Sequence, residues 1–147
     1  MAAARCENED RVTMVSMVLL LLEDNAERVR RMSAAILRAK PGTEIKVWAD
    51  AHVMVREAGA ALERAAVGSL DHDLDAGASG TDPGDGLDVA RYLVGQPVVR
   101  SVIVHTSNSD RGRMMMGEFE LARWPCERVL PLGDDWIETE WAGAVVK

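Results

Sequence analysis

The chain contains a run of five consecutive apolar residues, Val18–Leu22, that leads directly into Glu23 and Asp24. The run does not alternate between apolar and polar residues, so it predicts a strand that is buried on both faces. Strands of this kind belong to parallel sheets with helices packed on both sides. The run therefore favours an α/β fold, and the two acids mark a polar strand end.

Helical and strand patterns alternate along the rest of the sequence. Apolar residues recur at helical spacing after the first run, and Pro41 and Gly42 end that helix. Strands are predicted at 18–22, 44–48, 67–70, 101–104 and 128–132, and helices at about 26–40, 51–66, 86–94, 110–123 and 134–146. This alternation predicts five parallel strands with five helices on both faces, a flavodoxin-like three-layer sandwich. The common strand order for such a fold is 2-1-3-4-5.

Length and charge limit the classes of protein that this sequence can belong to. Its 147 residues suffice for one compact domain. Residues 1–13 carry no periodicity and predict a frayed leader, so we expect a single domain over 14–147. The net charge of −7 argues against broad binding to nucleic-acid backbones. Recognition of a single nucleotide or of an RNA end stays open.

The cysteine content and the first apolar segment bear on the compartment. Two cysteines are too few for a disulfide framework, which favours a reducing cytoplasm. The segment Met14–Leu22 is too short to span a membrane and lacks a small-residue cleavage site. We therefore expect a cytoplasmic protein without a membrane span.

Polar residues follow three of the predicted strands. They are Glu23 and Asp24 after the first strand, Asp71-His72-Asp73 after the third, and His105-Thr106-Ser107-Asn108 after the fourth. In the 2-1-3-4-5 order these strands are neighbours, so their polar ends meet in one crevice. Clustered carboxylates repel one another unless a cation offsets the charge, and they supply the oxygen ligands that Mg²⁺ or Mn²⁺ prefers. The predicted metal ligands are Glu23, Asp24, Asp71 and Asp73.

Several of these residues also have a purely structural interpretation. Glu23 or Asp24 could cap the helix that follows. Asp73 or Asp75 could shape the Gly-rich loop between Asp75 and Asp85 through side-chain turns. Thr106 and Ser107 could likewise cap the next helix. Sequence alone leaves both interpretations open.

Two of the three histidines, His72 and His105, fall at the predicted site, while His52 begins an ordinary helix. A neutral imidazole can transfer protons near pH 7, and an imidazolium can neutralise a phosphate oxygen. Neighbouring residues on a strand point to opposite faces. If Asp71 and Asp73 face the crevice, regular strand geometry turns His72 away from it.

The order of these motifs resembles the response-regulator receiver domain from Val18 onward. Glu23 and Asp24 match the family's metal-binding pair, and Asp71 matches its phosphoacceptor aspartate. Thr106 matches the hydroxyl residue at the end of the fourth strand, and Pro131 matches the proline after the switch lysine. The resemblance implies a receiver-like fold with a divalent cation at the acidic pair.

The sequence departs from the receiver pattern in two places. Leu130 occupies the lysine position, and the loop between Asp71 and Asp85 is several residues longer than usual. Together with the motifs Leu-Asp-His-Asp-Leu and His-Thr-Ser-Asn, these departures resemble a divergent branch, the cyclic-phosphate processing receiver domain. That resemblance implies a role on cyclic phosphates, such as nucleotides or RNA ends in repair.

The leading hypothesis is a domain that binds or processes a phosphoester, in its enzymatic form a metal-dependent cyclic-phosphate phosphodiesterase. Its predicted catalytic residues are Asp71, His72, His105, Thr106 and Asn108, with Mg²⁺ or Mn²⁺ at the acids. The histidines would move protons or neutralise charge. Thr106 and Asn108 would orient the phosphate by neutral hydrogen bonds.

Two other functions are compatible with the same sequence. One is a signalling receiver in a phosphorelay, phosphorylated on Asp71 and switched through Thr106. The other is a degenerate receiver that only binds a protein partner or a second copy of itself, through a final helix carrying Trp136 and Trp141. Loss of the lysine weakens the signalling hypothesis, because a phosphoaspartate would lack one of its usual counter-charges.

Overall fold

The computed structural model describes residues 16–147, so the predicted leader and the predicted start of the domain lie outside the described residues. Five strands form one parallel sheet in the order β2-β1-β3-β4-β5, which confirms the predicted order. The strands are β1 (Val18–Leu22), β2 (Glu44–Trp48), β3 (Val67–Leu70), β4 (Ser101–Val104) and β5 (Cys126–Arg128).

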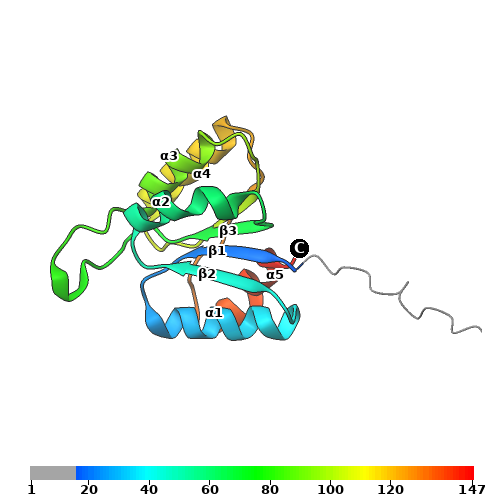
Figure 1. Ribbon diagram of the computed structural model, residues 1–147. Helices are drawn as coiled ribbons and strands as arrows, with labels where there is room; N and C mark the ends of the chain where they lie inside the picture. The colour runs from blue at the N-terminus through cyan, green and yellow to red at the C-terminus, as the bar shows by residue number, and fades with distance from the viewer. Residues whose placement is uncertain (1–15) are drawn as a thin grey trace, which may run out of the picture.

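Helices cover both faces of this sheet, as Figure 1 shows. The elements are α1 (Ala26–Ala39), α2 (Ala51–Leu62), α3 (Gly86–Val94), α4 (Ser109–Leu121) and α5 (Ala142–Val145), with a 3₁₀ turn η1 (Gly77–Ser79) and a π-helical turn η2 (Ile137–Trp141). One face, called the α1 face, packs against α1, η2 and α5. The other, called the α2 face, packs against α2, α3 and α4.

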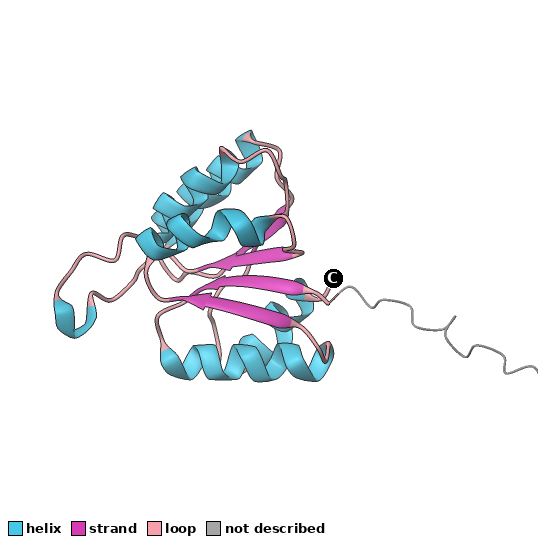
Figure 2. Cartoon of the chain, in the orientation of Figure 1, coloured by secondary structure: helices cyan, strands magenta, loops and turns pink. Residues whose placement is uncertain are grey.

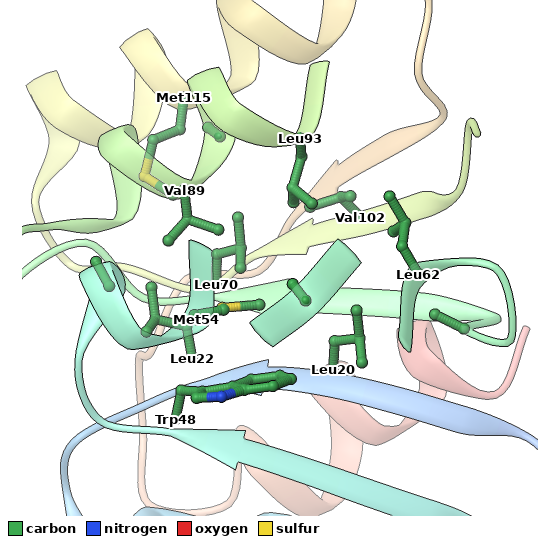
Figure 3. Close-up of a cluster of buried hydrophobic side chains, with 14 of the residues drawn as sticks. Leu20, Leu22, Trp48, Met54, Leu62, Leu70, Val89, Leu93, Val102 and Met115 are labelled. Atoms are coloured by element: carbon green, nitrogen blue, oxygen red, sulfur yellow. The ribbon is translucent and has the colours of Figure 1, made fainter. Parts of the chain in front are cut away.

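The side chains of each strand alternate between two apolar cores. Leu20 and Leu22 point into the core of the α2 face, which Figure 3 shows together with Trp48. Leu19 and Leu21 point into the core of the α1 face. All four leucines are at most 1% exposed, so β1 is buried on both faces, as its apolar run predicts. This alternation decides which polar residues at the strand ends meet.

The long segment between β3 and α3 leaves the sheet at the end of β3 and extends away from it, with η1 near its tip (Figures 1 and 2). It returns at Gly86, whose backbone N–H donates a 3.0 Å hydrogen bond to the carbonyl of His72. A Cβ at Gly86 would lie 2.0 Å from the carbonyl oxygen of Asp71. Glycine is therefore required where α3 begins beside the end of β3.

Three predicted elements differ from the structure by more than two residues at one end. β5 is Cys126–Arg128 and not 128–132, because its register follows the short β4, with Val102 opposite Cys126 and Val104 opposite Arg128. α2 ends at Leu62 and not at 66, because hydrogen bonds from Arg64 and Ala65 to carbonyls three residues earlier close its last turn.

The predicted last helix, 134–146, is divided between η2 and α5. No helix among the described residues has the length and apolar content to cross a membrane.

Candidate functional site

Glu23, Asp71 and His105 form one row across three neighbouring strands. Leu22 pairs with Leu70, and Leu70 pairs with Val104, so the next residue of each strand belongs to the same row. The ladder continues there, because Asp71 N–H donates to Leu22 O at 3.0 Å and His105 N–H donates to Leu70 O at 2.9 Å. By the alternation of strand side chains, all three point to the α1 face. We call them the acidic row.

Both carboxyl groups of the acidic row are buried, with Glu23 1% exposed and Asp71 6% exposed. Burial and the neighbouring Asp71 carboxylate raise the pKa of Glu23 from its ordinary 4.5 to about 8. Burial also raises the pKa of Asp71. Without a cation Glu23 is therefore protonated near neutral pH, and a cation between the two carboxyls would allow both to ionise.

His105 is completely buried, and burial lowers the pKa of its ring to about 3, so the imidazole is neutral. Its Nδ1 lies 2.7 Å from Ser69 Oγ, and Trp141 Nε1 donates a 2.9 Å hydrogen bond to the same hydroxyl. Its Nε2 lies 3.8 Å from Glu23 Oε1, too far for a hydrogen bond. Within residues 16–147, Nε2 has no hydrogen-bond partner.

The π-helical turn η2 places two tryptophans beside His105. Trp141 N–H donates to Trp136 O at 2.9 Å, five residues earlier, which is the hydrogen bond of a π-helix. Trp136 stacks on the His105 ring with 6.2 Å between centroids, while Trp141 contacts Ser69. The C-terminal segment thus fixes the orientation of the imidazole from the α1 face of the sheet.

The positively charged side chain of Arg28 lies against the acidic row. Its Nη1 is 3.4 Å from Glu23 Oε1, and its guanidinium lies 5.5 Å from the centre of the Trp136 ring. The side chain is 33% exposed, so it connects the buried row with solvent. Arg28 stands in the first turn of α1, whose N-cap Asn25 accepts a hydrogen bond from Arg28 N–H.

Asp24 and Asp73, the other two predicted metal ligands, lie outside the acidic row. An Asp24 oxygen accepts a hydrogen bond from Asp75 N–H and ties the start of the long loop to the end of β1. Asp73 has a 64% exposed side chain. It accepts hydrogen bonds from Asn108 Nδ2 at 3.4 Å to both of its oxygens.

His72 points away from the acidic row, as strand alternation predicts. It is 6% exposed, with Nδ1 2.8 Å from Asp73 Oδ1 and Nε2 3.5 Å from Asp85 Oδ2. Asp85 caps α3 through a reciprocal pair of hydrogen bonds with Asp88. His72 therefore lies beside the start of α3, and its Nε2 has no hydrogen-bond partner among the described residues.

Thr106 and Asn108 follow His105 in the turn before α4. Thr106 is 1% exposed, and its hydroxyl accepts a 3.2 Å hydrogen bond from Asn108 N–H. The Asn108 side chain caps α4 by accepting from Arg111 N–H. Arg128 of β5 donates to the carbonyls of Thr106 and Asn108 and holds this turn in place. Leu130, at the position that the resemblance assigns to lysine, is 43% exposed.

The donor set of the acidic row fits a divalent cation. One ligand atom from each of its three residues lies within 4.8 Å of the other two. Two carboxylates and an imidazole are a common ligand set for first-row transition metals. The mutual repulsion of the acids and the unpartnered Nε2 are both relieved by a cation at this position.

Sequence reasoning did not find Arg28, Ser69 or Trp141 as parts of the site. Ser69 precedes Asp71 by two residues and therefore lies on the same face of the strand. The alternation of strand side chains could have predicted this. Trp136 and Trp141 are five residues apart, the spacing of a π-helical turn. Arg28 stands one helical turn beyond the acidic pair, but only the packing of α1 on the sheet brings it back to Glu23.

Solved structures that are similar to this chain include response-regulator receivers. The phosphorylated cyanobacterial phytochrome response regulator RcpA is 18% identical, with a TM-score of 0.64 over 88% of this chain and 91% of that chain. The Mn²⁺-bound form of the response regulator Rcp1 is 16% identical, with a TM-score of 0.60 over 88% of this chain and 91% of that chain.

A CheX–CheY complex of Borrelia burgdorferi with BeF3 and Mg²⁺ gives 12% identity and a TM-score of 0.64, over 88% of each chain. No curated protein sequence matches this chain. A family model does match: the Cyclic-phosphate processing Receiver domain, over residues 18–121. That range holds β1 to β4 and all three residues of the acidic row. The chain therefore belongs to the cyclic-phosphate processing receiver domain family.

Proposed function

We propose that this domain binds and processes a phosphoester, a cyclic phosphate of a nucleotide or of an RNA end, at a divalent cation held by the acidic row. The observation that carries the proposal is the burial of Glu23 and Asp71 side by side, with the pKa of both carboxyls raised. Two carboxylates buried side by side are costly inside a protein unless a bound cation balances their charge. A divalent cation at this position supplies Lewis acidity to a phosphoryl oxygen.

Arg28 replaces the lysine that a typical receiver would supply. Leu130 carries no charge, whereas the Arg28 guanidinium lies against Glu23 and reaches solvent. A guanidinium presents parallel N–H donors that match two phosphate oxygens. Arg28 therefore orients the phosphate, and Thr106 and Asn108 contribute neutral hydrogen bonds from the β4–α4 turn.

Asp24 and Asp73 would form the rim of the proposed site, and His72, which is buried and points away from the acidic row, would act only through Asp73. Asp73 is held by both His72 and Asn108, so His72 positions this carboxylate for the exposed side of the site. Asp24 offers a further carboxylate next to Glu23. Protons would be exchanged with solvent at this rim, because the His105 ring is buried and neutral and cannot exchange protons with solvent.

The test compares the wild type with Asp71→Asn in the presence of Mn²⁺. We expect the wild-type domain with Mn²⁺ to open a 2′,3′-cyclic nucleotide or an RNA 2′,3′-cyclic end, and Asp71→Asn to lose this activity. Asp110→Asn is the matched control, because the Asp110 side chain is 91% exposed and outside the site. Turnover that is equal in the wild type and in Asp71→Asn would contradict the proposal.

A second candidate function is a signalling receiver phosphorylated on Asp71. The observation that favours it is Thr106, a buried hydroxyl residue at the end of β4 next to the row that holds Asp71. Under this function acetyl phosphate or beryllofluoride binds in an Asp71-dependent way without turnover of cyclic phosphates. Absence of both activities, and of metal binding, leaves a cytoplasmic protein-interaction domain, acting on a partner or a second copy of itself.

A further inference from the structure

We propose that His105 Nε2 is itself a ligand of the cation, so that the site selects Mn²⁺ or a similar first-row transition dication over Mg²⁺. This inference rests on the metal site of the proposed function and names its ligand set. It assigns His105 the role of a nitrogen ligand and not that of an acid or base.

The backbone fixes the position of this nitrogen relative to the two carboxylates. Glu23, Asp71 and His105 stand in one row of three hydrogen-bonded strands, so their Cα positions are set by the sheet and not by a loop. Nε2 lies 3.8 Å from Glu23 Oε1, a separation that leaves room for both atoms to contact one ion. All three ligand atoms fall within 4.8 Å of one another.

The other ring nitrogen is already occupied, which points Nε2 at the carboxylates. Nδ1 lies 2.7 Å from Ser69 Oγ, and this hydroxyl is held in turn by Trp141 Nε1 at 2.9 Å. A hydroxyl oxygen has two lone pairs, so Ser69 can accept from Trp141 and from His105 Nδ1–H together. Nε2 is then the unprotonated nitrogen. Histidines that bind metals are commonly oriented by such a partner on the second nitrogen.

A purely structural role for His105 explains less of this geometry. A buried histidine without a metal function normally satisfies both nitrogens, because an unpartnered buried polar atom is costly. Here Nε2 has no partner within the part of the chain that the structure describes, although the ring is completely buried. Nε2 points toward the two carboxyl groups of the acidic row. A cation placed between them would contact all three groups and balance the charge of the acids.

The chemical consequence is a change of metal preference. Mg²⁺ prefers oxygen ligands in octahedral geometry and binds imidazole poorly. Manganese, iron and cobalt dications accept imidazole together with carboxylates. A receiver with three oxygen ligands would take Mg²⁺, whereas the acidic row supplies two carboxylates and one nitrogen.

The test uses pulsed electron paramagnetic resonance of Mn²⁺ bound to the full chain, which detects a directly coordinated ¹⁴N nucleus. We expect ¹⁴N coupling in the wild type and its loss in His105→Gln. The control His52→Gln changes an exposed histidine on α2 and should keep the coupling. Calorimetric titration should show that the wild type prefers Mn²⁺ to Mg²⁺ and that His105→Gln loses this preference.

Ser69→Ala serves where His105→Gln fails to fold. It removes the partner that orients Nδ1, so we expect Mn²⁺ affinity to fall by about 10- to 100-fold. All three ligands stay in place, so the ¹⁴N coupling should be retained. Bound Mn²⁺ without ¹⁴N coupling in the wild type overturns the inference and leaves the proposed function standing. No Mn²⁺ binding at all overturns the proposed function and this inference with it.

Discussion

Arg28 Nη1 lies 3.4 Å from Glu23 Oε1 and stands in the first turn of the helix that follows the acidic pair. The same guanidinium lies over the Trp136 ring, so α1 and η2 hold it from two sides. Under the proposed function it takes the role of the lysine that a receiver would carry at the position of Leu130. The contact makes Arg28 the first residue to change when the phosphate site is tested.

Arg28→Gln is expected to weaken binding of a cyclic nucleotide by about tenfold or more, because the loss of one charge-assisted hydrogen bond costs about 1.5–3 kcal/mol. Calorimetric titration with a nonhydrolysed cyclic nucleotide in the presence of Mn²⁺ measures this. The control is Arg30→Gln, which removes an exposed arginine paired with Glu27 on the same helix. Equal affinity in Arg28→Gln and in the wild type would remove Arg28 from the site.

Glu23 gives the metal-free protein a characteristic dependence of stability on pH. Its pKa is about 8 in the folded state and about 4.5 in the unfolded state, so the folded state holds the extra proton between these values. The contribution of Glu23 to the free energy of unfolding is therefore fully present below about pH 4.5. It is lost as the pH rises to about 8, by about 1.4 kcal/mol for each pKa unit.

His105 acts in the opposite direction at lower pH. Its pKa is about 3 folded and 6.5 unfolded, so its contribution rises with pH up to about 6.5 and partly cancels that of Glu23. In EDTA, the net fall is therefore expected between about pH 6.5 and 8. Glu23→Gln should gain stability relative to the wild type over that interval in urea unfolding. A constant difference between the two proteins at pH 6 and pH 8 would contradict the raised pKa.

Ser69 and Trp141 are expected to act as one unit in stability. Ser69→Ala leaves two buried nitrogens without a partner, His105 Nδ1 and Trp141 Nε1, at a cost of about 1–3 kcal/mol for each. Trp141→Phe removes one of these nitrogens. The double variant should therefore be less destabilised than the sum of the single variants. Additive changes in the free energy of unfolding would show that the hydrogen bond from Trp141 contributes nothing.

Gly86→Ala is expected to destabilise the fold by roughly 1–3 kcal/mol, because the new Cβ would meet the carbonyl of Asp71 and this backbone cannot move without displacing the site. Gly117 in α4 is the control, since nothing lies within 4 Å of a Cβ there. Gly117→Ala should instead stabilise by about 0.5–1 kcal/mol. Thermal melting of the two variants checks the pair, and a neutral Gly86→Ala would mean that α3 can shift away from β3.

The sequence predicted the sheet well because each buried strand has a local signature. Four strands have the predicted bounds, since apolar runs such as Val18–Leu22 end at polar residues. β5 differs because its pairing is decided by β4 and not by its own composition. The apolar residues Leu130 and Leu132 follow the ladder and are exposed, which no local pattern distinguishes from a strand.

Part of the site could be predicted from the strand order and from the alternation of side chains along each strand. Strand alternation turns His72 away from Asp71 and toward Asp85, as observed, whereas the shared face of Glu23 and Asp71 also depends on the register between β1 and β3. The strand order places His105 at the same crevice, and the register between β3 and β4 adds that it lies in the same row as Asp71. The contribution of Arg28 and of η2 depends on helix packing over the sheet, which lies beyond any local pattern.

The most direct test of the central claim is calorimetric titration of the metal-free wild-type protein with Mn²⁺, repeated on Asp71→Asn and on the exposed control Asp110→Asn. The account predicts one bound Mn²⁺ per chain in the wild type and in Asp110→Asn, and its loss in Asp71→Asn. Binding that survives in Asp71→Asn, or no binding in the wild type, would contradict a metal site at the acidic row.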